Sequence, residues 1–204
     1  MPTPHTAACE EMIALLNPPR IYLQHVEDLD RLRELFAIDQ AAYNECSLEF
    51  ATFRHWWERY DLGSRVLLSD NEIVAGLGIY PLATEQAIAF EQGRICEGDL
   101  LPVPIAECEA QPVHDWYISG IVVVNSLRGA GSPLRRLLRL GLSSWIDSGH
   151  VAYPLNLQAI AYSEAGRRLL ELLGFAKIRV ATELPDHCDL YKLRLESSHI
   201  LGAT

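Results

Sequence analysis

A short glycine-rich turn is the stretch of this sequence best suited to binding a charged ligand. It reads SLRGAG and follows an apolar, β-branched run at residues 117–124 that predicts a buried strand. Ser132 and Pro133 come next, and these residue types favour a helix start, with Ser as N-cap and Pro in the first turn. Backbone N–H groups that converge at the positive end of a helix suit a phosphate or a pyrophosphate. The same residues are also compatible with an ordinary strand–turn–helix connection.

A family resemblance favours the ligand-binding interpretation of this turn. The run IVVVNSLRGAGS resembles the acetyl-CoA-binding segment of the GCN5-related N-acetyltransferase (GNAT) superfamily, in which Arg or Gln is followed by two residues, Gly, one residue, and Gly or Ala. Arg128 and Gly131 match the first two of these anchors, and Gly129 matches a frequent Arg-Gly opening. Pro133 departs from the pattern, because Gly or Ala is usual at its position. Residues 163–175 end in Leu-Gly-Phe and resemble a later helix of the family, and two motifs in the right order are stronger than one.

The resemblance implies a fold, a cosubstrate and an activity. The implied fold is α/β, with a GNAT-like mixed, mostly antiparallel sheet flanked by helices on both faces. The implied reaction is acetyl transfer from acetyl-CoA to a small-molecule or peptide amine, with coenzyme A as the product, no metal, and a homodimer left open. The resemblance implies that the central strand runs beside the pantetheine chain of coenzyme A, that the turn binds its pyrophosphate, and that the start of the later helix also contacts it. On the strand these residues are Ile121, Val122 and Val123; in the turn they are Arg128, Gly129, Ala130, Gly131 and Ser132; at the later helix the residue is Ser163.

The catalytic groups are less clearly indicated than the cosubstrate contacts. The family often places a base on the central strand, and this position corresponds to Tyr117, whose usual pKa near 10 suits an acid better than a base. Asp115, His114 and the glutamates of the preceding loop are alternatives, each of which is more often structural. Many members carry an acidic tyrosine four residues before Gly-Phe, where this chain has Leu170. Tyr162 lies on the other side of the helix start, so the usual acid is absent.

Two other classes of function remain compatible with the sequence. One is a non-catalytic acyl-CoA-binding or regulatory module that has kept the phosphate-binding turn and lost the acid. The other is an unrelated nucleotide-binding protein, although the turn has neither the G-x-G-x-x-G nor the G-x-x-x-x-G-K-[ST] pattern. A metal enzyme is disfavoured, because none of the seven histidines pairs with another His, Cys or Glu at a recognised zinc spacing.

The elements that must position these residues follow from hydrophobic periodicity and turn signals. Helices are expected at 7–16, from 27 onward, at 47–60 with Ser47 as N-cap, at 84–92, from Ser132, and from Ser163 to Gly174. Strands are expected at 20–26, 65–69, 72–80, 117–124, 151–161, 175–183 and 189–195. Residues 81–113 show no other clear element, carry several acids and three prolines, and read as a family-specific loop region that either covers a site or pads an edge.

One predicted helix is unusually aromatic. Residues 47–60 contain five aromatic side chains at helical spacing, which core packing explains most simply. The resemblance implies that this helix walls an acceptor pocket, so Trp57 or Tyr60 could line it.

The totals limit the class of protein. A chain of 204 residues, with 49% hydrophobic and 22% charged residues, predicts one globular domain that spans residues 1–204. A net charge of −10 argues against non-specific binding to nucleic acid or to anionic membranes, and it mildly favours a cationic acceptor. No apolar run is long enough for a membrane span, and the N-terminal residues lack the pattern of a signal peptide. Five cysteines without a C-x-x-C pair suggest reduced thiols and a cytoplasmic protein.

Overall fold

A computed structural model describes residues 21–43, 48–127 and 132–197. The predicted leading helix 7–16 and most of the glycine-rich turn lie outside these residues. No helix of the described part is long and apolar enough to cross a membrane.

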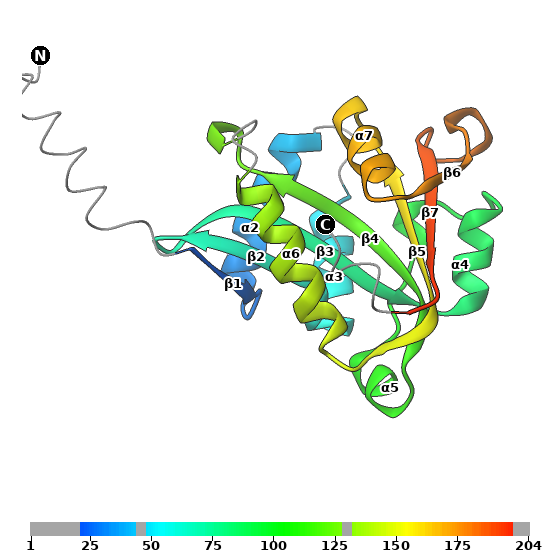
Figure 1. The fold of residues 1–204 in the computed structure, drawn as a ribbon, viewed down its shortest axis with the longest axis horizontal. Coiled ribbons are helices and arrows are strands. Elements are labelled where there is room, and N and C mark those ends of the chain that lie inside the picture. Colours follow the sequence, from blue (N-terminus) through cyan, green and yellow to red (C-terminus); the bar gives the residue numbers. More distant parts are fainter. Residues whose placement is uncertain (1–20, 44–47, 128–131, 198–204) are drawn as a thin grey trace, which may run out of the picture.

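A single twisted sheet of seven strands forms the centre of the molecule (Figure 1). Its order is β1-β2-β3-β4-β5-β7-β6, and each neighbouring pair is antiparallel except β4 with β5. The strands are β1 Ile21–His25, β2 Ser64–Ser69, β3 Glu72–Leu82, β4 Val113–Val123, β5 Val151–Ala161, β6 Ala176–Arg179 and β7 Asp189–Leu195. The mixed, mostly antiparallel sheet expected from the family resemblance is therefore confirmed.

Helices cover both faces of this sheet, as expected. They are α2 Leu29–Tyr43, α3 Phe50–Arg59, α4 Thr84–Glu91, α5 Ile105–Ala110, α6 Ser132–Ile146 and α7 Glu164–Leu172, with short 3-10 turns η2 Asp61–Gly63, η3 Glu97–Asp99, η4 Asn125–Leu127 and η5 Ala181–Glu183. A Cβ added at Gly76 of β3 would lie 2.3 Å from Leu35 of α2, and one added at Gly141 of α6 would lie 2.7 Å from Leu77 of β3. Because successive residues of a strand point to opposite faces, α2 and α6 pack on opposite sides of β3.

Local sequence signals explain where several elements begin and end. The Asp28 carboxylate accepts hydrogen bonds from the backbone N–H groups of Asp30 and Arg31, at 3.0 and 2.8 Å, and so starts α2. The β2–β3 hairpin turns at Asp70 and Asn71, both with positive φ, as its Asp-Asn sequence predicts. Gly174 has a φ of 87° directly after α7, which matches the glycine stop expected there.

Four sequence-based boundaries are wrong. The expected strand 175–183 divides into β6 and η5, because the Asp189 carboxylate accepts the Ala181 N–H at 2.9 Å and turns the chain away. Helix α3 begins at Phe50 with Glu49 as its N-cap, and the expected cap Ser47 lies outside the described residues. Helix α6 begins at Ser132 itself, one residue earlier than the N-cap assignment predicts. The central strand begins at Val113 and not at residue 117.

The region 81–113, called the insertion below, is an ordered connection between β3 and β4, and the expectation of a loop with a single helix is incomplete. Helix α4 ends at Glu91, two residues before the predicted stop Gly93, whose φ is 68°, and η3 and α5 follow it. The Val103 N–H donates to the Pro81 carbonyl at 2.9 Å, which holds the returning chain against the end of β3. The insertion therefore presents its residues at defined positions beside the sheet.

Candidate active site

The central feature of the candidate site is the point where β4 and β5 separate. Their parallel pairing runs from Val113 with Val151 to Ile118 with Ala159. Beyond Ile118, β4 pairs only with β3 among the described residues, and this pairing continues as far as Val123 with Ala75. The β3 register skips Ser119, which marks a β-bulge, and a bulge bends a strand and increases its twist. Residues 119–123 thus form an edge, called the open edge of β4 below.

Backbone groups of the open edge are directed toward the separation. The Val124 N–H donates to the Val74 carbonyl of the β3 side at 3.1 Å. Because backbone groups alternate in direction along an antiparallel strand, Ile121 and Val123 direct theirs away from β3. The Tyr43 hydroxyl donates to the Ile121 carbonyl at 3.0 Å, which agrees with this direction. Val122 differs from its two neighbours, because its side chain packs into the small core beneath α2.

The predicted pyrophosphate turn falls only partly within the described residues. Arg128, Gly129, Ala130 and Gly131 lie outside the described residues. Helix α6 starts at Ser132, shortly after the open edge, so its positive end follows the strand as the motif predicts. Contact of these residues with a pyrophosphate stays a prediction.

Ser163 has a structural role that is visible in the fold. It is the N-cap of α7, and its hydroxyl oxygen accepts the Gly166 N–H at 3.1 Å. This confirms the helix cap predicted from the sequence. The expected contact of Ser163 with coenzyme A stays a prediction.

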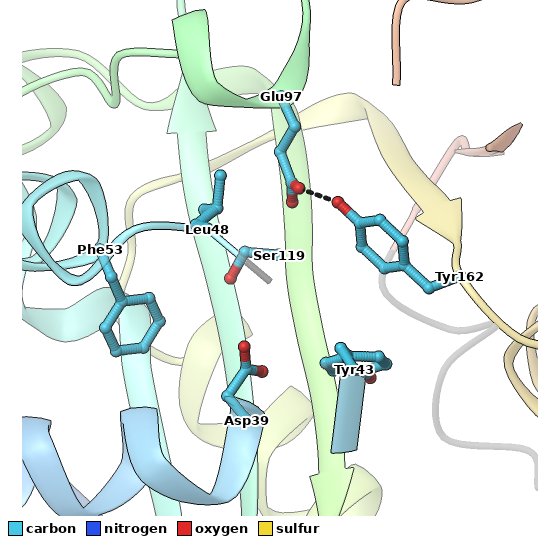
Figure 2. Close-up of a pocket in the computed structure, with 7 residues that line it drawn as sticks. All are labelled: Asp39, Tyr43, Leu48, Phe53, Glu97, Ser119 and Tyr162. Atoms are coloured by element: carbon cyan, nitrogen blue, oxygen red, sulfur yellow. Dashed lines mark hydrogen bonds between the residues drawn. The ribbon is translucent and has the colours of Figure 1, made fainter. Parts of the chain in front are cut away.

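A partly open cavity lies beside the bulge, between the open edge and the helices α2 and α3 (Figure 2), and its empty space, open solvent included, is about 260 Å³. Its lining combines two carboxylates, three aromatic rings, a hydroxyl and one aliphatic side chain: Asp39, Tyr43, Leu48, Phe53, Glu97, Ser119 and Tyr162. A second cavity of about 230 Å³ shares Asp39, Phe53 and Ser119 with it and runs over the glycines of β3 and β4.

Glu97 is the most constrained acid of the cavity. Its carboxylate accepts a hydrogen bond of 2.6 Å from the Tyr117 hydroxyl of β4 and another from the Tyr162 hydroxyl at the end of β5. Its backbone N–H donates to both carboxylate oxygens of Asp186, at 3.1 and 3.0 Å. Only 2% of the residue is exposed. Two tyrosines therefore fix the Glu97 carboxylate at the wall of the cavity, and Asp186 fixes its backbone.

The environment of Glu97 suits proton transfer near neutral pH. Burial raises the pKa of Glu97 from 4.5 to about 7, the tyrosine hydrogen bonds lower it, and the charges of Asp186 and Asp39 raise it. Burial and the charge of Glu97 raise the pKa of Tyr117 and of Tyr162 well above 10, so both hydroxyls remain donors. A carboxylate that is about half ionised at pH 7 can act as a general base.

The structure places Tyr117 behind Glu97, and a direct catalytic role for Tyr117 stays a prediction. Its side chain is 1% exposed, does not line the cavity, and has its hydroxyl on Glu97. We therefore interpret Tyr117 as a residue that positions Glu97.

Removal of the Tyr117 hydroxyl should move the pH dependence of activity. We expect Tyr117→Phe to raise the pKa of Glu97, because one of the two donors that stabilise the ionised carboxylate is lost. Activity should fall at pH 6.5 and recover at pH 9, and a pH profile of kcat/KM would show the shift. Tyr22→Phe, at an exposed tyrosine of β1, is the matched control. Equal losses at both pH values would contradict the positioning role.

The alternative bases named from the sequence, which are Asp115, His114, Glu107 and Glu109, do not line the cavity. Asp115 is buried and accepts hydrogen bonds from Thr84 and Asn156, at 2.8 and 2.9 Å. His114 is exposed, with Nδ1 2.9 Å from the Pro154 carbonyl, and the two glutamates of α5 are exposed. These groups have structural or surface positions.

The aromatic helix contributes to the cavity through a residue other than the two expected. The Trp57 indole donates to the Val26 carbonyl at 2.9 Å, and Tyr60 is fully buried with its hydroxyl 3.0 Å from His150 Nδ1. The core interpretation thus holds for Tyr60, whereas Phe53 of the same helix lines the cavity.

Sequence reasoning missed Glu97 and dismissed Tyr162. Tyr162 directly follows β5, the neighbour of the central strand, and this position at the carboxyl end of a buried strand was a usable signal. Glu97 stands in the sequence Cys-Glu-Gly-Asp within the insertion, where no periodic pattern points to it.

Comparison with known proteins identifies the fold. No protein-family model and no curated protein sequence matches the chain. The loading GNATL domain of CurA from Lyngbya majuscula is similar in structure, with a TM-score of 0.62 and 13% identity over 86% of this chain and 98% of that chain. The GphF GNAT-like decarboxylase in complex with isobutyryl-CoA has a TM-score of 0.58, with 14% identity over 85% and 98% of the two chains. A mosquito arylalkylamine N-acetyltransferase-like protein has a TM-score of 0.57, with 16% identity over 86% and 100%. The chain therefore has the fold of the GCN5-related N-acetyltransferase superfamily, which its two sequence motifs also indicate.

Proposed function

We propose that this protein transfers an acetyl group from acetyl-CoA to the nitrogen of an amine, with Glu97 as the general base. The observation that carries this proposal is a buried carboxylate with a pKa of about 7 at the wall of a cavity beside the open edge of β4. The GNAT fold and the presence of isobutyryl-CoA in the GphF structure support an acyl-CoA ligand.

Several residues of the chain fit the proposed cosubstrate. The open edge of β4 lies beside the cavity, where a pantetheine chain would run, and the start of α6 suits the pyrophosphate. Bound acetyl-CoA would supply the thioester. A bond from the amine nitrogen to the carbonyl carbon would replace the C–S bond, and the coenzyme A thiolate would leave and take up, through solvent, the proton that the nitrogen loses.

The residues of the cavity would prepare the acceptor for this attack. Glu97, once ionised, accepts a proton from the acceptor ammonium and leaves a free amine. Tyr117 and Tyr162 hold the carboxylate in place, and the aromatic walls limit the access of water. Positioning and proton transfer are the two contributions that these residues supply.

A turnover assay across amines tests the proposal. Release of the CoA thiol should depend on the amine, and mass spectrometry should find the acetylated amine. Tight CoA binding without turnover across small amines and peptides would contradict catalysis and favour the non-catalytic acyl-CoA-binding module.

Pro133 provides a separate test of the phosphate site. It lies buried in the first turn of α6, where free N–H groups would face an anion, and it has none to offer. One charge-assisted hydrogen bond is worth about 1.5–3 kcal/mol, against about 0.4–1 kcal/mol for the rigidity of proline. The difference of about 0.5–2.6 kcal/mol leads us to expect that Pro133→Gly binds CoA roughly 2- to 80-fold more tightly by calorimetry, with a slightly lower Tm. Unchanged or weaker binding in folded protein would mean that Pro133 only starts the helix.

A further inference from the structure

A buried arginine lies on the face of the sheet that α6 covers (Figure 1). Arg65 of β2 pairs with Leu77 of β3 and with His25 of β1, so these three side chains point to one face. Leu77 packs against α6, because a Cβ added at Gly141 of that helix would lie 2.7 Å from the leucine side chain. Arg65 is 0% exposed and lines neither of the two cavities beside β4. Its guanidinium group is therefore enclosed between the sheet and α6, outside the candidate active site.

The guanidinium group of Arg65 has no partner in the part of the chain that the structure describes. None of its three nitrogens, Nε, Nη1 and Nη2, makes a hydrogen bond, although each is a donor. The cation–π contacts between described residues involve Arg33 and Lys177 instead. Buried arginine side chains are normally paired, because a charge that is taken out of water without a partner strongly destabilises the folded state.

No described carboxylate supplies the missing negative charge. Burial lowers the pKa of Arg65 to about 10, and the only other groups that shift it are Tyr60 and Tyr80. Burial raises the pKa of both tyrosines well above 10, so both hydroxyls are neutral at pH 7. Asp61 acts on the pKa of the neighbouring His25, but it is exposed and does not shift the pKa of Arg65. Arg65 is therefore a buried cation at pH 7 and needs a counter-ion.

His25 offers a second donor beside Arg65. The two residues lie directly opposite each other in the β1–β2 ladder, where Cβ atoms on one face are about 4.5–5.5 Å apart. The Nδ1 atom of His25 is buried and has no hydrogen-bond partner among the described residues. Burial and the charge of Arg65 lower the pKa of His25, so its ring is neutral at pH 7, and Nδ1 can carry a hydrogen.

We propose that Arg65 and His25 bind one small monovalent anion, such as chloride, between the sheet and α6. The anion accepts hydrogen bonds from the guanidinium group and from His25 Nδ1–H, and its single negative charge balances that of Arg65. The enclosed position favours a monatomic ion over a phosphate or a carboxylate ligand, which would need a wider space. A buried water molecule can accept the same hydrogen bonds, but it does not balance the charge.

Thermal unfolding at constant ionic strength tests this site. Sodium chloride replaces sodium gluconate stepwise at a fixed total salt concentration, so that the screening of surface charges stays the same. An anion that binds only the folded protein raises Tm, and the wild-type Tm should rise by about 5–10 °C when chloride reaches a hundredfold excess over its Kd. A wild-type Tm that is equal in the two salts would overturn the proposal without any variant.

Arg65→Met shows whether the anion acts at this residue. Methionine is unbranched and uncharged, so the variant needs no counter-ion, and its Tm should be the same in chloride and in gluconate. In gluconate it should be at least as stable as wild type, because a buried charge without a partner has been removed. Arg168→Met is the matched control: the side chain of Arg168 on α7 is 74% exposed, and the variant should keep the wild-type response to chloride. A folded Arg65→Met protein with that same response would overturn the assignment.

Bromide locates the ion directly. Crystals of the wild-type protein grown in sodium bromide should show an anomalous scattering peak within hydrogen-bond distance of the Arg65 guanidinium group and of His25 Nδ1. A water molecule at this place, or no bromide there, would overturn the proposal. Acetyl transfer plays no part in these measurements, so the anion site stands or falls independently of the proposed function.

Discussion

Replacement of Glu97 by Gln is expected to lower kcat/KM for acetyl transfer by about 10²- to 10⁴-fold, the range that a positioned general base contributes. Glutamine keeps the size of the side chain and can still interact with the hydroxyls of Tyr117 and Tyr162, so the cavity should persist. The KM for acetyl-CoA should change little, because Glu97 belongs to neither the open edge nor the start of α6, where we propose that acetyl-CoA binds. Steady-state release of the CoA thiol with the best amine acceptor measures the effect.

The pH profile should identify Glu97 as the group that titrates. The base acts when it is ionised, so wild-type kcat/KM should rise with pH and level off above about 7, the pKa of Glu97. Tyr117 and Tyr162 stay protonated across this range, and the other facing groups are the carboxylates of Asp186 and Asp39. The rise near pH 7 should be absent in Glu97→Gln.

Glu107→Gln is the matched control for this experiment. Glu107 lies exposed on α5 of the same insertion, so its replacement removes an equal charge without touching the cavity. Loss of activity in both variants, or a folded Glu97→Gln protein with more than a tenth of wild-type kcat/KM, would contradict the role of Glu97.

The same substitution should stabilise the protein in alkaline solution. The folded state raises the pKa of Glu97 from 4.5 to about 7, so it holds this proton more tightly than the unfolded chain. The stabilisation that the protonated Glu97 gives to the folded state is therefore fully present below pH 4.5, and it is lost as the pH rises through 7. The difference of about 2.5 in pKa corresponds to about 3 kcal/mol of unfolding free energy. Glu97→Gln carries no charge and should escape this loss.

Denaturant unfolding at pH 4 and pH 9 tests the prediction. Relative to wild type, Glu97→Gln should gain about 3 kcal/mol between these two pH values, or roughly 6–12 °C in Tm for a chain of this size. Glu107→Gln should follow the wild-type curve. If the two variants respond to pH in the same way, burial does not disfavour the charged form of Glu97.

The fold was accessible from the sequence because local signals agreed with tertiary packing. The β2–β3 hairpin, β5, β7 and the cap of α7 match their predicted positions, since Asp-Asn turns, β-branched runs and a serine cap act over short distances. The expected strand 175–183 failed for the opposite reason. A carboxylate eight residues away at Asp189 ends β6 early, and periodicity does not contain that contact.

The site was less accessible, because its geometry depends on residues far apart in the chain. Glu97 becomes a candidate base only through hydrogen bonds to Tyr117 and Tyr162, which lie 20 and 65 positions away. Its raised pKa arises from its burial in the folded protein, and no local sequence pattern predicts that burial. Tyr117 was predicted as a catalytic residue from its position on the central strand. In the structure its hydroxyl donates to the Glu97 carboxylate, and its side chain does not line the cavity.

Because Glu97 lies in the insertion between β3 and β4, the proposed reaction depends on whether the short turn that carries Glu97 is folded in place. Glu97 reaches the cavity on a 3-10 turn of three residues, held by a capping interaction between Cys96 and Asp99 and by the bond to Asp186. A molecule in which this turn detaches would keep the sheet and the open edge of β4, and would lose only its proton acceptor. The fraction of competent molecules is then set by the free energy of that local opening, which can be far smaller than the free energy of global unfolding. Amide exchange at residues 96–100 therefore reports on how much of the protein is able to react at a given moment.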